Sequence, residues 1–340
     1  MIRAYGAVAE SCRNVVFREV SVPDPGAEDV VVRVEYSWIS NGTESSFIRG
    51  ERIGGDTPRL PTDPMPFPHI SGYQKVGVVE SVGSKVDASR VQVGDRVFAT
   101  ISRVLNMFYD HAGHISPAVT HQSQVYRLPD GVDSLDYSGL VLTQVGYNVG
   151  TCGEIAQGDA AIVIGDGMVG HWSAQTLQTR GARVMLLGRH DSRLALFKCA
   201  TGDCCVNEIT NEDVAAAIKQ WAPNGVQFVA DTVGSIDSMY SLMPHMRHSG
   251  HLVSAGFYGN NGLIDIQRMR MKELSLHAPA GWSPSRLEAT MDLIHKGELT
   301  TRHLITSIVP ASQAGAAFNS ILNKDPGVLG VVLDWREVNG

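Results

Sequence analysis

Short apolar runs with alternating polar positions fill the first 130 residues of the chain. They are clearest in VVFREVSVP, DVVVRVEYS and KVGVVESVG, which cover 15–23, 29–37 and 75–83. Clusters of Pro, Gly and Asp separate the runs, and the proline-rich stretch 54–68 should form an irregular loop. Alternation with a period of two between such turns is typical of antiparallel strands. The pattern therefore predicts an antiparallel, barrel-like β domain at this end of the chain.

The pattern changes near residue 135, where helical periodicity begins to alternate with apolar runs. The segment AAIVIG at 160–165 is apolar throughout, as expected of a strand that is covered on both faces. The further elements that we expect are strands at 182–188, 226–232 and 250–256, and helices at 135–153, 170–181, 211–222 and 283–297. Strands that alternate with helices form a parallel sheet with right-handed crossovers. The sequence therefore predicts an α/β protein with a doubly wound parallel sheet.

Composition and charge exclude several classes of protein. The 340 residues suffice for about two domains, and 43% hydrophobic with 19% charged residues is ordinary for a globular chain. The net charge of −7 argues against a surface that binds nucleic acid or anionic membranes. Neither a long apolar span nor a signal peptide is visible, and five cysteines without a C-x-x-C suit a reducing compartment. We expect a cytoplasmic protein.

A G-x-G-x-x-G motif, formed by Gly165, Gly167 and Gly170, follows the apolar run at 160–165 and opens a helical pattern. This context is the one that a dinucleotide site requires. The first glycine permits a tight turn, the second lets the backbone approach a pyrophosphate, and the third allows close packing of helix on strand. The helix start, with Met168 and Val169, presents free N–H groups to the phosphates. The motif therefore predicts a dinucleotide cofactor.

The end of the second strand of this unit indicates which dinucleotide binds. An NAD site has Asp or Glu about 20 residues beyond the motif, where it binds the ribose hydroxyls. Gly188 stands at that place here, and Arg189, His190 and Arg193 follow it. Without the carboxylate a 2′-phosphate is not repelled, and a guanidinium can bind it with two hydrogen bonds. We therefore predict NADP(H); the alternatives are solvated loop charges, or Asp191 folded back as a substitute acid.

Segments spread over nearly the whole chain resemble, in order and spacing, the medium-chain dehydrogenase/reductase superfamily. They are VESVGSKVDASRVQVGDRV (79–97), RLPDGV (127–132), GDAAIVIGDGMVG (158–170), FVADTVG (228–234), MRHSGHLVSAGFYG (246–259), KELSLHA (272–278) and PGVLGVVLDW (326–335). The resemblance implies a GroES-like catalytic domain, 1–145 with 282–340, and a Rossmann domain at 146–281. Further cofactor contacts are then expected at Thr143, Thr232, Val233, Ala255, Gly256 and Phe257.

The chain departs from the zinc-containing members of that superfamily at each place where they carry a catalytic ligand. Asn41 stands for the cysteine of their I-C-G-[ST]-D motif, and Tyr73 with Gln74 stand for the pair in G-H-E. The third region, 142–150, offers neither cysteine nor carboxylate, and the four-cysteine structural lobe is missing. Zinc sites are built from thiolate, imidazole or carboxylate ligands. We therefore expect an enzyme without zinc, and interpret His111 and His114 as loop histidines.

The segments ISNGTESSFIRG (39–50) and HISGYQKVGVVESVG (69–83) resemble a narrower branch, the bacteriochlorophyllide-dehydrogenase-like group. That group shares an S-x-G-T-E signature. The resemblance does not fix the substrate.

Candidate catalytic residues lie where the metal would be. Tyr73 can donate its phenolic proton to a substrate oxygen, and Lys75, two residues on, would lower the pKa of that phenol if it lay close. By the resemblance, Thr43 matches a proton-relaying hydroxyl and Glu44 an orienting acid, while Asn41 can donate an amide N–H. The alternatives are that Tyr73 fills the volume of the lost metal and that Lys75 is structural.

The sequence favours a zinc-independent, NADP(H)-dependent oxidoreductase that interconverts a small alcohol and a carbonyl compound. Polar residues at 41, 43, 73 and 74 favour this chemistry over a quinone or enone double-bond reductase, the second hypothesis. The third is a nicotinamide-binding protein that has lost catalysis. By analogy we expect a homodimer, with its contact at the sheet edge near 250–256.

Overall fold

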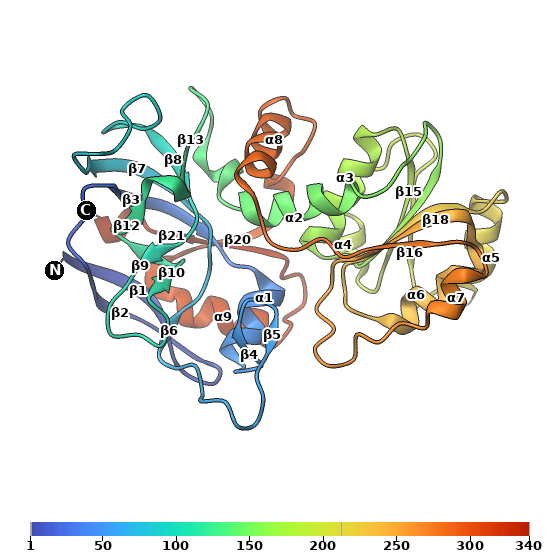
Figure 1. Ribbon diagram of the computed structural model, residues 1–340, viewed down its shortest axis with the longest axis horizontal. Helices are drawn as coiled ribbons and strands as arrows, with labels where there is room; N and C mark the ends of the chain where they lie inside the picture. Colours follow the sequence, from blue (N-terminus) through green and yellow to red (C-terminus); the bar gives the residue numbers. More distant parts are fainter. Residues whose placement is uncertain (1, 212, 340) are drawn as a thin grey trace. The chain divides into compact units, whose positions relative to one another are not determined.

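The computed structural model describes residues 2–211 and 213–339 and divides the chain into two compact units. Unit 1 comprises Met1–Val141 and Thr301–Gly340, and unit 2 comprises Leu142–Thr300 (Figure 1). The second boundary therefore lies after the predicted helix at 283–297 rather than before it. Hydrogen bonds explain the difference, because Trp172 and Gln175 both donate to the carbonyl of Thr300 within unit 2.

Unit 1 consists mainly of strands. They are β1 (Ile2–Ser11), β2 (Asn14–Val22), β3 (Asp29–Trp38), β4 (Arg52–Gly54), β5 (Thr57–Pro58), β6 (His69–Ile70), β7 (Lys75–Val82), β8 (Arg96–Ala99), β9 (Ser102–Arg103), β10 (His111–Ala112), β11 (Ile115–Ser116), β12 (Ala118–His121), β13 (Val125–Arg127), β20 (Ile305–Pro310) and β21 (Gly330–Asp334). Its helices are α1 (Asn41–Ile48) and α9 (Ala314–Leu322), with short 3-10 helices η1 (Gln122–Gln124), η2 (Ser134–Tyr137), η4 (Arg302–Leu304), η5 (Ala311–Gln313) and η6 (Arg336–Asn339).

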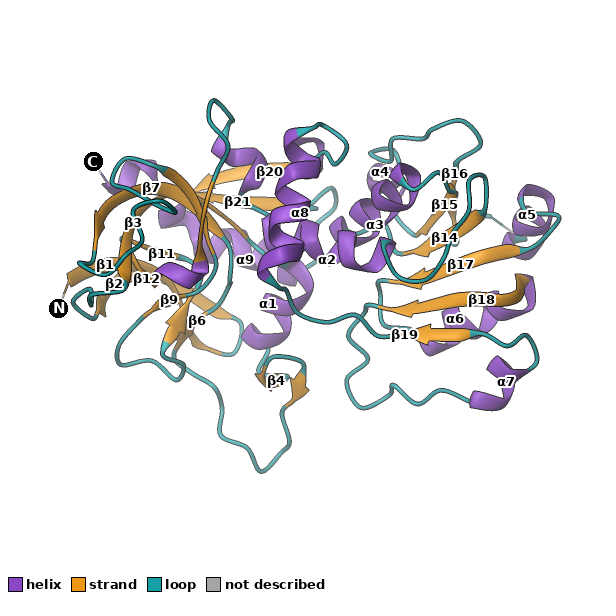
Figure 2. Ribbon diagram, turned by 45° about the horizontal axis from the view of Figure 1, so that its top comes forward, coloured by secondary structure: helices purple, strands orange, loops and turns teal. Residues whose placement is uncertain are grey.

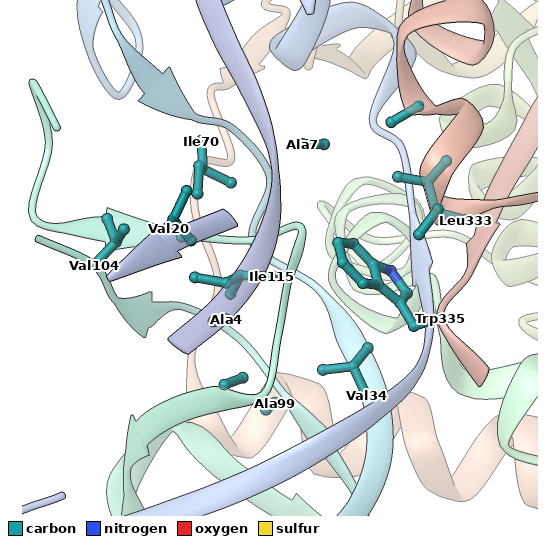
Figure 3. Packing of buried hydrophobic residues seen from close by; sticks show 14 of the residues in the cluster. Ala4, Ala7, Val20, Val34, Ile70, Ala99, Val104, Ile115, Leu333 and Trp335 are labelled. Carbon is teal, nitrogen blue, oxygen red and sulfur yellow. The ribbon is translucent and has the colours of Figure 1, made fainter. Parts of the chain in front are cut away.

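Two sheets enclose the core of unit 1. One has the order β13-β8-β7-β3-β21-β20, with β12 also on β3, and the other has the order β11-β1-β2, with β6 also on β1. The pairs are antiparallel except for β20 with β21. Figure 3 shows part of the core, where Val20, Ile70 and Ile115 gather from β2, β6 and β11. The antiparallel β domain predicted from the alternating runs is confirmed.

Unit 2 alternates strands with helices. Its elements are α2 (Leu140–Gly150), which begins at the boundary, then β14 (Ala160–Ile164), α3 (Met168–Thr179), β15 (Arg183–Gly188), α4 (Asp191–Leu194), β16 (Cys204–Asn207), α5 (Val214–Trp221), β17 (Val226–Asp231), α6 (Ile236–Leu242), η3 (Met243–His245), β18 (Met246–Ser254), α7 (Ile266–Arg270), β19 (Ser275–His277) and α8 (Pro284–His295). Figure 2 shows its strands side by side with their arrows in one direction.

The sheet of unit 2 is parallel and has the order β16-β15-β14-β17-β18-β19, that of a Rossmann domain. Every residue of β14 is buried, because alternate residues enter different clusters. Ala161 and Val163 pack with Leu177 of α3, whereas Ile162 and Ile164 pack with Ile218 of α5. This double coverage is the reason for the unbroken apolar run at 160–165.

The predicted dimer edge is wrong in its position. Residues 250–256 fall largely in β18, which pairs with β17 on one side and with β19 on the other. The strand at that end of the sheet is β19, whose Leu276 is exposed. Of the helices in the described part of the chain, none combines the length and the hydropathy that a membrane span requires.

Candidate active site

The Tyr73 hydroxyl in unit 1 lies in a group of polar side chains contributed by α1 and the segment before β7. It donates to Ser40 Oγ at 2.8 Å. Burial raises the pKa of Tyr73 to about 12, against the lowering effect of hydrogen bonds with Ser40 and Thr43. The phenol therefore stays protonated at neutral pH and can act as a hydrogen-bond donor or an acid, but not as a base.

Glu44, in the first turn of α1, holds the groups around Tyr73 in place. Its Oε1 accepts from the backbone N–H of Ser40 at 2.7 Å, and its Oε2 accepts from Ser71 Oγ at 3.0 Å. The carboxylate thus ties the residue that precedes α1 to the residue two before Tyr73. Glu44 therefore positions these neighbouring groups, and its role as an orienting acid in the reaction stays a prediction.

His114 is the buried partner of Glu44. Its Nε2 lies 2.7 Å from Glu44 Oε2, and its Nδ1 lies 2.8 Å from Ser37 Oγ. Trp335 Nε1 donates to the same Ser37 oxygen at 2.8 Å. The arrangement fits a ring whose Nε2–H donates to Glu44 and whose Nδ1 accepts from Ser37. His114 lies in the bend between β10 and β11, as expected of a loop histidine, but it is fully buried, whereas His111 lies in β10 and is exposed beside Asp110.

Gly72, directly before Tyr73, is required by this packing. Its φ is +92°, and a Cβ there would lie 2.7 Å from His114 Nε2. A Cβ on Gly113 would in turn lie 2.0 Å from the carbonyl carbon of Gly72. Two backbone segments therefore touch without side chains between them. This contact places Tyr73 beside the Glu44–His114 pair.

Lys75 is fully buried and does not act on Tyr73. Its Nζ donates to the carbonyl of Thr100 at 2.5 Å and to Ser102 Oγ at 2.9 Å, with the carbonyl of Ala112 at 3.4 Å. Burial lowers the pKa of Lys75 to about 7. The expectation that Lys75 shares a face with Tyr73 is wrong, because β7 begins at Lys75 and the segment before it is irregular. The lysine is structural.

Asn41 and Gln74 have their amide N–H groups turned to the backbone. Asn41 Nδ2 donates to the carbonyl of Leu329 at 2.6 Å, and Gln74 Nε2 donates to the carbonyl of Trp38 at 3.0 Å. Asn41 Oδ1 is buried and has no hydrogen-bond partner among the described residues. The structure thus brings together Tyr73, Thr43 and Glu44, while Asn41 presents an acceptor in place of the expected donor.

The glycine-rich loop of unit 2 has the shape expected of a pyrophosphate site. Gly165 has a φ of +113° and forms the turn after β14. A Cβ on Gly170 would lie 1.9 Å from the carbonyl oxygen of Gly165, whereas a Cβ on Gly167 would meet nothing within 4 Å. Gly167 therefore has open space beside it. It directly precedes α3, whose first turn contains Met168 and Val169.

The turn after β15 contains the residues that were expected to bind the adenosine ribose of the cofactor. Arg189 and His190 are exposed, and Arg193 is half-buried. Asp191 does not fold back as a substitute acid, because it is exposed and accepts from Asn207 Nδ2 at 2.6 Å. Instead, Asp166 of the glycine-rich loop lies beside Gly188.

A cavity of about 360 Å³ opens at the carboxyl ends of β14 and β15. Ile164 and Leu187 line it with Arg189 and Glu208. In doubly wound folds this edge of the sheet is where a nucleotide binds. Its size and its apolar floor suit an adenosine.

The other expected cofactor residues surround the ends of β17 and β18. Thr232 Oγ1 donates to the carbonyl of Ile164 at 2.8 Å, and Val233 is exposed. Ala255 and Gly256 both donate their N–H to the carbonyl of Asp231, and Phe257 lies against Gly234. Thr143 is fully buried in α2. Buried Asp231 anchors this edge by accepting from Val233, Gly234, Ser235 and Tyr258.

Comparison with known proteins identifies this architecture. The family profile described as "Alcohol dehydrogenase GroES-like domain" matches residues 26–183, and the one described as "Zinc-binding dehydrogenase" matches 169–296. The chain belongs to the medium-chain dehydrogenase/reductase superfamily. It is an oxidoreductase of the dehydrogenase type, with a GroES-like domain in unit 1 and a Rossmann-type domain in unit 2.

Individual relatives are similar over almost the entire chain. A 2-desacetyl-2-hydroxyethyl bacteriochlorophyllide A dehydrogenase from Cereibacter sphaeroides is 25% identical over 98% of this chain and 99% of its own. A crystal structure described as a short chain alcohol dehydrogenase from E. coli CFT073 in complex with NADH superposes with a TM-score of 0.82, at 19% identity over 98% of this chain and 99% of that one. A putative zinc-binding dehydrogenase from Sinorhizobium meliloti 1021 bound to NADP gives a TM-score of 0.81, at 19% identity over 98% and 100%.

One of the matching family profiles is described as a zinc-binding dehydrogenase, but the residues at the expected ligand positions of this chain are not ordinary zinc ligands. Within residues 2–211 and 213–339, no group of three or more His, Cys, Asp or Glu side chains could hold a metal. Glu44 and His114, the acid and imidazole of the site, are bound to each other and to serines. An amide and a phenol stand where the superfamily carries a thiolate and an imidazole, and neither is an ordinary zinc ligand.

Several site residues could not be identified from the sequence. Ser40, Ser71 and His114 lie far apart in the chain and share no spacing pattern, although the H-x-x-H was visible. Asp166 was visible as an acidic residue inside the glycine motif. Gln144 is fully buried in α2, with neither amide atom hydrogen-bonded to a described residue.

Proposed function

We propose that this dehydrogenase interconverts an alcohol and a carbonyl compound, uses NADP(H) and needs no zinc. The observation that carries the proposal is the Tyr73 phenol, which stays protonated and stands where the superfamily carries a metal ligand. A metal polarises a carbonyl oxygen, and a fixed hydrogen-bond donor can stabilise the same developing charge. The resemblance of 39–50 and 69–83 to the bacteriochlorophyllide-dehydrogenase-like group does not identify the substrate of this chain.

The residues of unit 2 fit a dinucleotide. Gly165, Gly167 and the first turn of α3 would hold the pyrophosphate, and the cavity floored by Ile164 and Leu187 would hold the adenosine. The unsatisfied amide of Gln144 supports a polar ligand near α2, since burying an amide without partners costs about 1–3 kcal/mol. When bound, the nicotinamide supplies or accepts the hydride.

Tyr73 handles the proton of the reaction. In the reducing direction, the carbonyl carbon gains a hydride and the carbonyl oxygen gains the proton of the Tyr73 hydroxyl. The hydroxyls of Ser40 and Thr43, both hydrogen-bonded to the phenol, can relay a proton from water to the phenolate, each hydroxyl giving up one proton and gaining another. Glu44 fixes Ser40 through its backbone N–H, and Ser40 accepts the phenolic hydrogen bond in the free protein, so the O–H bond must turn toward the substrate oxygen when a carbonyl compound binds.

The test is a set of reactions with the purified full chain and NADPH. Saturated aldehydes and ketones, and separately conjugated enones, are supplied while NADPH consumption is followed and the products are identified. Conversion of a saturated carbonyl to its alcohol supports the proposal. Reduction of only the carbon–carbon double bond of an enone would replace it by the double-bond reductase. NADPH binding without turnover of either class would replace it by a silent binding protein.

A further inference from the structure

The carboxylate at the ribose end of unit 2 comes from the glycine-rich loop and not from the end of β15. Asp166, the second residue of the G-x-G-x-x-G motif, is buried against Gly188. A Cβ on Gly188 would lie 2.6 Å from both Cβ and Oδ2 of Asp166. Only glycine fits at the end of β15 while this aspartate is present. The two positions therefore form one structural pair.

The protein itself uses the hydrogen-bonding capacity of the Asp166 carboxylate. Its Oδ2 accepts from the backbone N–H groups of Arg189 at 2.7 Å and His190 at 2.8 Å. The His190 ring nitrogen Nδ1 lies 3.0 Å from the same oxygen and 3.1 Å from Oδ1, and Arg193 Nη1 lies 3.7 Å from Oδ1. The side chain is only 7% exposed. Most of the hydrogen bonds that this carboxylate accepts are therefore made within the turn 188–193.

These contacts fold the turn that carries the basic side chains. The backbone of 189–190 is tied to the loop by two charge-assisted hydrogen bonds, which are stronger than neutral ones. The side chains of Arg189 and His190 remain 62% and 53% exposed. Burial by itself raises the pKa of Asp166, but the N–H groups of Arg189 and His190 outweigh it and hold the pKa below its ordinary value.

Among the basic groups of the turn, Arg189 makes only a long contact with the acid that faces it. Arg189 Nε lies 3.8 Å from Glu208 Oε2, a long contact between an exposed and a half-buried group that contributes little energy. Asp191 is engaged with Asn207. The turn therefore presents the exposed guanidinium of Arg189 beside a carboxylate that accepts hydrogen bonds from two backbone N–H groups.

We infer that Asp166 is a positioning residue for cofactor choice: it shapes the turn 188–193 into the site for the 2′-phosphate of NADP(H). The inference rests on the proposed cofactor. Through the backbone of Arg189 and His190, the loop that is expected to bind the pyrophosphate also sets the geometry of phosphate recognition at the ribose. Asp166 is acidic and lies next to the proposed phosphate site, but its role is to hold the backbone of that site in place.

The test compares the binding of 2′,5′-ADP and 5′-AMP, which differ only by the 2′-phosphate, to the full chain. We expect the wild type to bind 2′,5′-ADP at least about 10-fold more tightly, the value of one charge-assisted contact. Asp166→Ala should remove most of that ratio and change 5′-AMP affinity less than about threefold. Asp166→Asn, which keeps one acceptor oxygen, should fall between the two. Arg189→Ala combined with Asp166→Ala should lose little more than Asp166→Ala alone.

Asp159→Ala is the matched control. Asp159 also accepts a backbone N–H, from Ala156, and pairs with an arginine, Arg247, but it lies at the start of β14. It should affect stability and leave the ratio unchanged. A ratio that stays at the wild-type value in folded Asp166→Ala, or that rises in Asp166→Asn, would overturn the inference while the cofactor proposal stands. A wild type without preference for 2′,5′-ADP would overturn both.

Discussion

The imidazole of His114 and the carboxylate of Glu44 lie 2.7 Å apart with both side chains almost completely buried. Each is a residue type that binds zinc in other enzymes, yet here they are partners of each other. Glu44 in addition accepts from the Ser40 N–H and from Ser71 Oγ; Ser40 accepts from the Tyr73 hydroxyl, and Ser71 lies two residues before Tyr73. The pair therefore holds in place the segments that surround the Tyr73 phenol.

Replacing Glu44 by Gln should destabilise unit 1. The amide presents an N–H group to one of three donors that now meet carboxylate oxygens, so at least one buried hydrogen bond is lost. Removing one partner of a buried charged hydrogen bond costs about 2–4 kcal/mol. Denaturant unfolding measures the loss. Glu51→Gln, which removes an exposed acid paired with Arg49, is the control and should cost under about 1 kcal/mol. Equal losses in the two variants would show that the Glu44 network contributes no more than a surface pair.

Tyr73→Phe should lower turnover by about 10²–10³, because one preorganised donor to the substrate oxygen is lost while the ring stays in place. The melting temperature and cofactor affinity should change little, whereas Tyr73→Ala should also destabilise the fold by leaving a cavity. Tyr126→Phe, in the β13 strand of the same unit, is the matched control. Near-normal turnover of Tyr73→Phe would make Tyr73 a space-filling residue and shift attention to Thr43.

Lys75 should make stability depend on pH in the alkaline range. Its folded pKa of about 7 lies below the ordinary 10.5, so the unfolded chain binds more protons between these values. The free energy of unfolding should therefore rise with pH from about 7 to 10.5, by at most about 1.4 kcal/mol per pH unit for this one proton, and this contribution should be flat below pH 7. The curve of the wild type minus that of Lys75→Met isolates the effect. A difference curve without slope in this window would contradict the lowered pKa.

Zinc should be dispensable. Purified enzyme should contain well under one zinc per chain, and chelators should leave turnover unchanged, because the described residues offer no set of zinc ligands. Metal analysis before and after chelation, with turnover measured in parallel, is the check. Stoichiometric zinc whose removal abolishes turnover would refute the zinc-independent part of the proposal.

Placing the carboxylate at the end of β15 should change which of the two cofactors, NADH or NADPH, binds more tightly. Asp166→Gly combined with Gly188→Asp removes the clash between these positions and frees the acid to accept from ribose hydroxyls. We expect NADH to bind more tightly than NADPH to this double variant, the reverse of the order expected for the wild type. Gly188→Asp alone is the control and should be destabilised by overpacking. If the folded double variant still binds NADPH more tightly than NADH, the proposed role of Asp166 in the turn 188–193 is wrong.

The sequence predicted several of the elements that bury continuous apolar surface and missed, among others, the short strands at the two ends of the parallel sheet. Strand β14 was found because both of its faces are covered, and β3 because its buried Val32, Val34 and Tyr36 alternate with the polar Arg33 and Glu35. The end strands β16 and β19 have four and three residues and are partly exposed, so they carry no apolar pattern. The partnership of Glu44 with His114 spans 70 positions, and no local periodicity records such a distance. Lys75 was misplaced for a related reason, since its side-chain direction depends on where β7 starts.

The packing of Asp166 on Gly188 also restricts how these two positions can evolve. A side chain at 188 is incompatible with the aspartate at 166, so the effect of a substitution at either position depends on the residue at the other. A lineage that moves its acid from the loop to the strand end must pass through a chain with glycine, or another small residue, at 166. Descendants of this sequence should therefore vary at 166 and 188 together. A change of cofactor in this lineage should be accompanied by a correlated pair of substitutions at these positions.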